Sequence, residues 1–534
     1  MAEQLFNQTS FLIRFILRRD RVRLSIWLIS IALITFVTAS AFTNLYQSEA
    51  ERQTIAETMK NPAMIAMVGQ GYGLDNYTNG AMMAHQMLLF TAMAVGIMSI
   101  LLVTRHTRAD EEDGRTEMIR SLPVGRLANL HATISVLAGI NVMLALIVGF
   151  GLYALGIDSM DLKGSLLYGA ALGVTGIFFA GLTSVFAQLT ESSRGTIGLA
   201  IAFLLLSYLV RAVGDVGNEV LSWSSPLGWV LGSEVYVNNY WWPVLLTLGV
   251  SVILFAIAFY LNGIRDVGAG FIPSRPGRKN ASPFLKSPFG LALRLQRTGL
   301  ISWAIGMFIL GISYGSVLGD LESFFGNNEM LAELITPTEG YTMTEQFLTM
   351  LMSVISMICT IPPLMAILKL KGEEKKNRTE HLLSRAVSRK KLMGSYLIIA
   401  ILSSLGMLVL AVLGLNIAGS AVMEEAIPVS KMLSAALVYL PAIWMMVGLA
   451  VFLIGFAPKL TGFSYLYLTY SFFVVYLGAL LQLPDWMGEL SPFGHIPQLP
   501  VDDMNYPVVS LLTMIALLLI MAGFIGYKNR DLEG

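Results

Sequence analysis

The sequence E-E-D-G-R-T-E-M-I-R-S-L-P-V-G-R at residues 111–126 has a second copy, E-K-K-N-R-T-E-H-L-L-S-R-A-V-S-R, at residues 374–389. At a constant offset of 263 residues, the two copies share Glu, Arg, Thr, Glu, Ser, Val and Arg. Each copy follows an apolar stretch and precedes another. A charged segment repeated between apolar stretches predicts a duplicated membrane protein with two equivalent segments on one side of the bilayer.

The composition places the chain in lipid. Of its 534 residues, 55% are hydrophobic and only 13% are charged, whereas soluble domains contain about 25% charged residues. The single cysteine, Cys359, lies in an apolar run, and the five histidines are scattered without an H-E-x-x-H pair. The sequence therefore predicts no metal site and no intrachain disulfide.

Hydropathy predicts twelve membrane spans, because a span needs about 20 mostly apolar residues. The expected spans are 24–45, 85–103, 129–155, 166–190, 197–213, 241–262, 300–318, 347–368, 392–418, 432–455, 462–482 and 506–526. Such runs can cross the bilayer only as helices. The predicted fold class is an all-α polytopic membrane protein of about 12 helices, built as two homologous six-helix halves.

The positions of Lys and Arg predict the orientation. With the N-terminus inside, 30 of the 35 basic residues lie on the cytoplasmic side, most of them in the N-terminal arm and in the segments 104–128, 263–299 and 369–391. We therefore expect both termini to be cytoplasmic, with 104–128 and 369–391 as cytoplasmic loops.

Further matches support two halves. Arg265-Asp266 matches Arg530-Asp531 just after the last span of each half, and S-P-L-G at 225–228 matches S-P-F-G at 491–494. The predicted domains are 1–262, with an N-terminal amphipathic helix at 4–19, a Pro/Arg-rich cytoplasmic linker at 263–288, and 289–534. The S-P-x-G segments fit either a turn in an interfacial belt or a short re-entrant hairpin.

The repeated segment permits two interpretations. Glu111 lies four residues before Arg115, a spacing that favours a short surface helix, and Pro123 should end that helix near Leu122. A solvated loop that obeys the positive-inside rule is one interpretation, but it does not require Glu, Thr and Ser in register. Mixed charge in register predicts instead a surface matched to a partner with two equivalent sites. The predicted docking residues are Glu111, Glu112, Arg115, Glu117, Arg120, Arg126, Glu374, Arg378, Glu380 and Arg389.

The predicted spans carry no Asp, Glu, Lys or Arg near the middle of the membrane, and Arg211 and Glu345 lie at outer ends. This argues against proton or sodium coupling. Methionine adapts to varied apolar ligands, although ordinary helix packing also explains each such residue. Candidate substrate-path residues are Phe90, Met93, Met98, Phe203, Tyr208, Met350, Met352, Met357, Tyr467, Tyr470 and Phe473. Pro362-Pro363 should kink or end the eighth span.

The chain has no ATPase motif of its own. The P-loop requires Gly-Lys, a dipeptide that never occurs here. No nucleophile elbow or paired carboxylates suggest catalysis either, so we expect no catalytic residues and no enzyme activity in this chain.

Four segments now carry a resemblance: D-E-E-D-G-R-T-E-M-I-R-S-L-P-V-G-R (110–126), W-S-S-P-L-G-W (223–229), R-D-V-G-A-G-F-I-P-S-R-P-G-R (265–278) and S-P-F-G-L-A-L-R-L-Q-R (287–297). The chain resembles the ABC-2 type permeases described as polyketide-antibiotic exporters, which are fused twelve-helix proteins of the bacterial cell membrane.

The resemblance implies a separate ATP-binding subunit, expected in two copies, with ATP and Mg on that subunit and no cofactor in this chain. It makes the charged loops coupling helices and implies lipophilic or amphiphilic antibiotics as substrates, moved outward. The second copy departs from the pattern, with Asn377, Ala386 and Ser388 in place of Gly, Pro and Gly. We therefore expect the second helix to end differently and the two contacts to be unequal.

Two alternatives remain at this point. A proton-coupled multidrug exporter of the major-facilitator type also has six plus six helices, and Asp110–Arg115 superficially resembles its loop between the second and third spans. A drug-sensing membrane scaffold would use the outer loops 46–84 and 319–346. A lipid-modifying enzyme is the least favoured reading. No nucleic-acid partner is expected.

Overall fold

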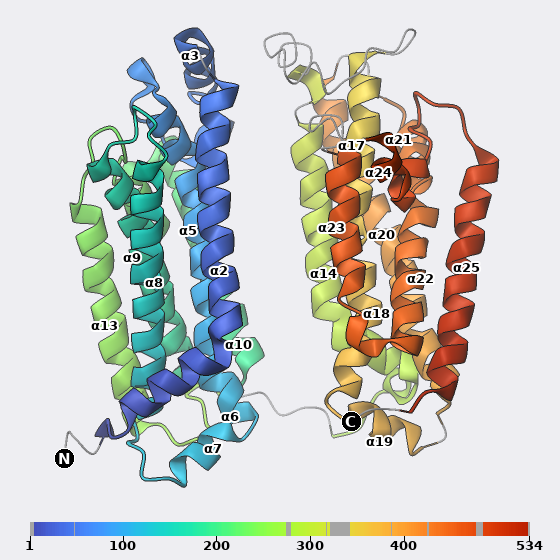
Figure 1. Ribbon diagram of the computed structural model, residues 1–534, viewed down its shortest axis with the longest axis horizontal. Coiled ribbons are helices and arrows are strands. Elements are labelled where there is room, and N and C mark those ends of the chain that lie inside the picture. Colours follow the sequence, from blue (N-terminus) through green and yellow to red (C-terminus); the bar gives the residue numbers. More distant parts are fainter. Residues whose placement is uncertain are drawn as a thin grey trace. The chain divides into compact units, whose positions relative to one another are not determined.

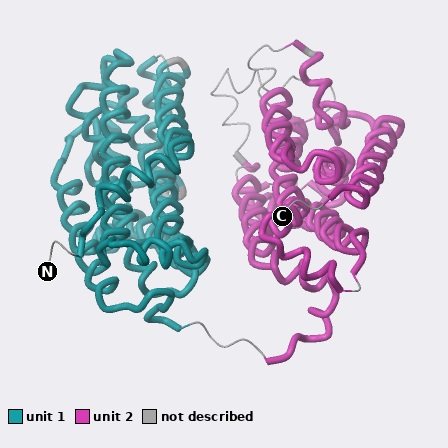
Figure 2. The backbone as a smooth tube through the Cα atoms, turned by 60° about the horizontal axis from the view of Figure 1, so that its bottom comes forward, with its two compact units in different colours: residues 1–277 teal, residues 278–534 magenta. Residues whose placement is uncertain are grey.

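The computed structural model describes residues 5–46, 48–273, 279–316, 318–320, 342–385, 387–423, 427–476 and 484–531. Within these ranges all regular structure is helical. The chain divides into two compact units, residues 1–277 and 278–534, each a bundle of long helices (Figure 1, Figure 2).

Unit 1 is built around a buried central helix. Its long helices are α2 (Thr9–Leu45), α5 (Asn79–Thr104), α8 (Ala128–Ala154), α9 (Leu162–Leu189), α10 (Ser193–Gly217) and α13 (Trp242–Ile264). Helix α9 is the most deeply buried of them and packs against α5, α8, α10 and α13. Glycine permits this approach, because a Cβ at Gly169 would lie 2.1 Å from the carbonyl oxygen of Ala145 on α8. Small residues at such crossings are typical of membrane helices.

Short helices occupy the two ends of unit 1. At one end a π-helical turn, η2 (Arg105–Ala109), leads into α6 (Asp110–Glu112) and α7 (Arg115–Arg120). The other short elements are α3 (Glu49–Thr58), α4 (Pro62–Val68), η1 (Leu74–Asn76), α11 (Glu219–Trp223) and α12 (Pro226–Leu231). Ser225 caps α12, because its Oγ accepts a hydrogen bond from the backbone N–H of Leu227 at 3.2 Å.

Unit 2 contains long helices α14 (Pro288–Gly315), α20 (Arg389–Val422), α22 (Leu440–Phe456) and α25 (Tyr506–Asn529), with α14 against α20 and α22 against α25. The remaining elements are η3 (Pro283–Lys286), η4 (Leu318–Asp320), α17 (Met343–Cys359), α18 (Ile361–Glu374), α19 (Arg378–Leu383), α21 (Val429–Leu437), η5 (Pro458–Leu460), α23 (Phe463–Tyr476), α24 (Asp485–Glu489) and η6 (Pro492–His495). The helix interrupted between α17 and α18 confirms the break predicted at Pro362-Pro363.

Among the described residues, eleven helices are long and apolar enough to cross a membrane. They overlap eleven of the twelve predicted spans. The exception is the span predicted at 462–482, where α23 has 14 residues and residues 477–482 lie outside the described ranges. Most of the predicted outer loop 319–346, part of the linker at 263–288, and Ala386 also lie outside them.

The N-terminal boundary of the first span was wrong. The predicted amphipathic helix at 4–19 and the span at 24–45 form one continuous helix, α2, which begins at Thr9. Figure 1 shows the N-terminal part of α2 running at a steep angle to the rest, across the end of unit 1 that carries α7. The chain before α2 contacts the start of α8, where the backbone N–H of Leu127 donates to the carbonyl of Leu5 at 2.9 Å.

Candidate functional site

The repeated segment forms the same local structure in both units. Gly114 and Asn377 precede α7 and α19 with φ angles of 71° and 55°, a left-handed conformation that glycine and asparagine adopt most readily. Each following helix has six residues, and the two helices end at positions that the 263-residue offset makes equivalent. The expectation that the second helix ends differently was wrong, because Ser121 and Ser384 follow the two helices with the same right-handed helical backbone conformation.

The ion pairs inside each segment are shifted by one residue from the prediction. Arg115 pairs with Asp110 at 2.7 Å and with Asp113 at 3.2 Å. In unit 2, Arg378 pairs with Glu373 at 3.3 Å. The predicted four-residue pairs, Glu111 with Arg115 and Glu374 with Arg378, do not form, because the left-handed residue interrupts the helix between their members.

The first glutamate of each segment instead forms a buried ion pair with the arginine that follows the last long helix of its unit. Glu111 pairs with Arg265 at 2.5 Å, and Glu374 pairs with Arg530 at 2.6 Å. The four side chains are between 4% and 13% exposed. Arg265 and Arg530 directly follow α13 and α25. Breaking such a pair would leave a buried charge unpaired, so it fixes the loop strongly to the end of the last helix.

The last arginine of each segment also binds the residue that follows the last long helix of its unit, through that residue's backbone carbonyl. The Arg126 guanidinium donates to the carbonyl of Arg265 at 2.9 Å, and Arg389 donates to the carbonyl of Arg530 at 2.5 Å. The shared threonines, Thr116 and Thr379, are both buried. The sequence alone had matched Arg265 to Arg530 but had assigned neither of them a partner.

Unit 1 holds its loop with additional contacts. Arg108 pairs with Glu111 at 2.7 Å and donates to the carbonyls of Ala187 and Ala269 at 3.1 and 2.8 Å. Glu112 accepts hydrogen bonds from the backbone N–H and the hydroxyl of Ser193 at 2.9 and 2.6 Å. This carboxylate lies at the N-terminus of α10, where the helix dipole favours negative charge.

The Gly125-to-Ser388 difference also has a structural cause. The backbone N–H of Gly125 donates to the carbonyl of Asn7 at 3.1 Å, and a Cβ at Gly125 would lie 2.3 Å from the carbonyl oxygen of Leu5. In unit 2, Ser388 caps α20 instead, by accepting from the backbone N–H of Lys391 at 3.2 Å.

The outer faces of α7 and α19 are exposed but differ in character. Arg115, Glu117, Arg378 and Glu380 are exposed. Two apolar residues that the sequence analysis did not propose for docking are also exposed: Met118 on α7 at 66% and Leu122, just after α7, at 59%. Their four-residue spacing in a charged segment was the available signal. The equivalent positions in unit 2 are the exposed residues His381 and Arg385.

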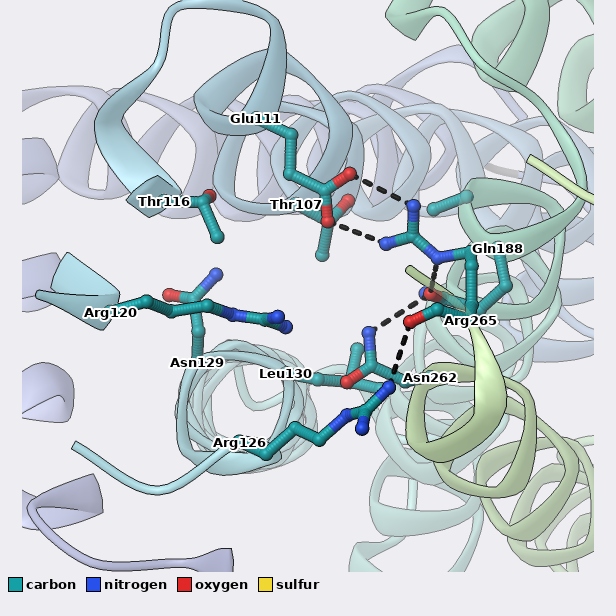
Figure 3. Close-up of a pocket in the computed structure, with 11 residues that line it drawn as sticks. Thr107, Glu111, Thr116, Arg120, Arg126, Asn129, Leu130, Gln188, Asn262 and Arg265 are labelled. Atoms are coloured by element: carbon teal, nitrogen blue, oxygen red, sulfur yellow. Dashed lines mark hydrogen bonds and ion pairs between the residues drawn. The ribbon is translucent and has the colours of Figure 1, made fainter. Parts of the chain in front are cut away.

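A small pocket lies beside the Glu111–Arg265 pair (Figure 3). It encloses about 10 Å³, enough for roughly one water molecule. The residues that line it come from η2, α6, α7, α9, α13 and the start of α8: Thr107, Glu111, Thr116, Arg120, Arg126, Asn129, Leu130, Ala187, Gln188, Asn262 and Arg265. Three predicted docking residues, Glu111, Arg120 and Arg126, thus line this pocket, and none of the substrate-path candidates does.

The structure brings some substrate-path candidates of unit 1 together. Met93 on α5 and Phe203 and Tyr208 on α10 pack against one apolar cluster, in which the ring of Phe203 lies 6.4 Å from that of Phe178. Phe90 is instead exposed and Met98 is fully buried.

In unit 2, Met352 and Met357 on α17 are buried and Met350 is half-buried. Tyr467 and Tyr470 on α23 stack with ring centroids 6.3 Å apart. Their hydroxyls donate to the carbonyls of Leu490 and Met487 at 2.6 and 2.9 Å. Phe473 is 49% exposed.

The chain's long apolar helices define a multi-pass membrane protein. The part of the chain that the structure describes contains no group of three or more His, Cys, Asp or Glu residues that could hold a metal ion.

Comparison with known proteins identifies the family. The family model described as "Multidrug efflux system permease Rv1217c, C-terminal domain" matches residues 12–261 and 285–528. The chain is 36% identical to the multidrug efflux system permease protein Rv1217c of Mycobacterium tuberculosis, over 99% of this chain and 96% of that protein. The chain therefore belongs to this multidrug efflux permease family, and its role is that of a transport permease.

Proposed function

We propose that this chain is the membrane-spanning subunit of an ABC transporter of the ABC-2 type. A separate ATP-binding subunit, present in two copies, would bind ATP and Mg and drive the export of lipophilic or amphiphilic compounds such as antibiotics. The single observation that carries the proposal is the loop that recurs in both units, with a six-residue helix exposed on its outer face.

The contacts within each loop suit a coupling role. Each loop joins two long helices and is tied by a buried ion pair to the end of a third. A force applied to α7 would therefore reach α5, α8 and α13 together, because the loop is fixed to all three. Two such loops match a partner that offers two equivalent sites. The two contacts with that partner would be unequal, because the loop of unit 1 exposes the apolar Met118 and the loop of unit 2 exposes the basic Arg385.

The proposed orientation follows the distribution of basic residues, with both termini and both loops in the cytoplasm of a bacterial cell and the spans in its plasma membrane. In this mechanism, closure of the ATPase pair pulls on α7 and α19. The pull would pass to the long helices of each unit, α5 and α10 in unit 1 and α17 and α23 in unit 2, and would release the substrate outward. The substrate-path candidates on these helices are the residues proposed to contact the substrate.

A charge-reversal experiment tests the docking surface. Glu117→Lys combined with Glu380→Lys should abolish co-purification of the ATP-binding subunit and the stimulation of its ATPase, because both exposed carboxylates lie on the proposed contact faces. Glu49→Lys combined with Glu219→Lys, at exposed positions of short helices outside the charged loops, is the matched control. Complex formation that survives the first pair of changes would contradict the docking proposal.

The energy source is tested separately. Efflux of a hydrophobic antibiotic from cells should stop when ATP is depleted and continue when an uncoupler collapses the proton gradient. The opposite result would favour proton coupling.

A further inference from the structure

The pocket beside Glu111 carries an excess of positive charge. Three guanidinium groups, from Arg120, Arg126 and Arg265, line it together with one carboxylate, Glu111. Figure 3 shows the three arginines pointing into the same space from different sides. Glu111 is already shared between Arg265 and Arg108, so its charge does not neutralise the other two arginines.

Arg120 has an unusual environment for an arginine. Among the contacts of the described residues, neither a hydrogen bond nor an ion pair involves its guanidinium, although the side chain is half-buried. Burial lowers the pKa of Arg120 although Glu111 opposes this effect, and the charges of Arg126 and Arg265 add to the lowering. Guanidinium groups placed together in this way favour the entry of an anion.

A buried hydroxyl supports the same conclusion. Thr116 is 3% exposed and lines the pocket, yet its Oγ has no hydrogen-bond partner. Buried polar side chains normally have a partner. A hydroxyl beside two arginines can donate to an anionic oxygen.

The pocket adjoins a wider groove that can admit a larger group. Arg120 and Arg126 also line this groove, together with Val124, Asp266 and Val267. Its volume is about 330 Å³, within the range of small-molecule sites. Asp266 is the single acidic residue of that lining.

The position of the groove indicates the source of the anion. It lies where α13 ends, and the last turns of α13 carry Tyr260 and Ile264 at 68% and 55% exposure within unit 1. Exposed apolar side chains near the end of a membrane-length helix suit contact with lipid, so a basic groove at this end suits a lipid headgroup. Basic pockets at the ends of membrane helices bind anionic headgroups.

The geometry points to a binding site for a phosphate group in this groove, held by Arg120 and Arg126 and supplied by the headgroup of an anionic phospholipid. The site belongs to unit 1 alone, because Leu383 occupies the position equivalent to Arg120 in unit 2. It does not depend on the proposed ATPase partner.

Binding of short-chain phosphatidylglycerol to the purified full-length chain in neutral detergent tests the site. The wild type should bind this lipid more tightly than short-chain phosphatidylcholine. Arg120→Gln should weaken phosphatidylglycerol binding by about tenfold or more, since a hydrogen bond between charged groups contributes about that much. Arg120→Lys, which keeps the charge but loses the planar fork, should give an intermediate affinity. Arg194→Gln, at an exposed arginine near the start of α10 in the same unit, is the matched control and should change nothing.

Inorganic phosphate, measured alone and in competition, distinguishes the two sources of the anion. Binding of phosphatidylglycerol that is tighter than that of inorganic phosphate and depends on Arg120 supports the lipid headgroup. Binding of inorganic phosphate that is equally tight and depends on Arg120 supports the phosphate site with a soluble occupant and overturns the lipid assignment. Equal phosphatidylglycerol affinity in wild type and Arg120→Gln would overturn the phosphate site. An acidic side chain of a partner protein would then be the alternative occupant of the groove.

Discussion

Glu374 and Arg530 offer the sharpest test of how the charged loops are held. Their side chains are 6% and 13% exposed and 2.6 Å apart. Removing one member of a buried pair typically costs about 3 kcal/mol, because the remaining charge is left without its partner in a medium of low dielectric. We therefore expect Glu374→Gln to lower the free energy of unfolding by about 3 kcal/mol. Arg530→Gln should cost somewhat less, because Arg530 is more exposed than Glu374 and the Arg530 carbonyl still accepts from Arg389.

The double variant should cost clearly less than the sum of the two single variants, with an interaction energy of about 1–3 kcal/mol. Equilibrium unfolding in mixed detergent micelles, followed by tryptophan fluorescence, measures all four proteins. Glu57→Gln and Lys60→Gln break an exposed pair whose side chains are 61% and 51% exposed, and should show an interaction energy of about 0–1 kcal/mol. Strictly additive costs for Glu374→Gln and Arg530→Gln would refute the claim that this ion pair fixes the loop.

Two further predictions concern packing and docking. Gly169→Ala should destabilise unit 1 by about 1–3 kcal/mol in the same unfolding assay, because the new Cβ overlaps the Ala145 carbonyl on α8. Gly249→Ala is the control and should be neutral or slightly stabilising, because its Cβ meets nothing within 4 Å. Equal effects of the two substitutions would contradict the packing argument. Met118→Ser should weaken co-purification of the proposed ATP-binding subunit about tenfold. It should not change thermal stability, since Met118 is 66% exposed. If the substitution lowers stability and leaves binding unchanged, Met118 stabilises the fold and does not contact the partner.

Hydropathy predicted most of the helices because lipid leaves a long apolar segment few alternatives to a helix. It failed at the start of α2, where charged residues suggested the end of a span. Asp20 there pairs with Arg105 at 3.0 Å and lies 2.9 Å from His106. The charge of Asp20 is thus paired with a residue just after the end of α5. The helix α2 therefore continues through this charged turn. A hydropathy profile records the charges but cannot see partners that lie 85 residues away along the chain.

The repeat identified the segments of the candidate site but not the roles of their residues. It singled out Glu111 and Glu374, yet it placed them on an exposed helix rather than in buried pairs. Their partners lie 154 and 156 residues further along the chain. Only the match between Arg265 and Arg530 hinted at them. The pocket beside Glu111 could not be predicted, because its lining comes from six elements, η2, α6, α7, α8, α9 and α13.

The pairing of Glu111 with Arg265 has a consequence for the biosynthesis of this protein. The ribosome makes the carboxylate 154 residues before it makes the arginine, so the charged loop of unit 1 cannot reach its final form until α13 has been synthesised. The same delay applies to Glu374 and the end of α25. A chain that stops before either arginine would carry an open loop with an unpaired acidic group. The closed loop therefore marks a unit whose last helix is in place, and any partner that recognises the closed form would bind only to completed units.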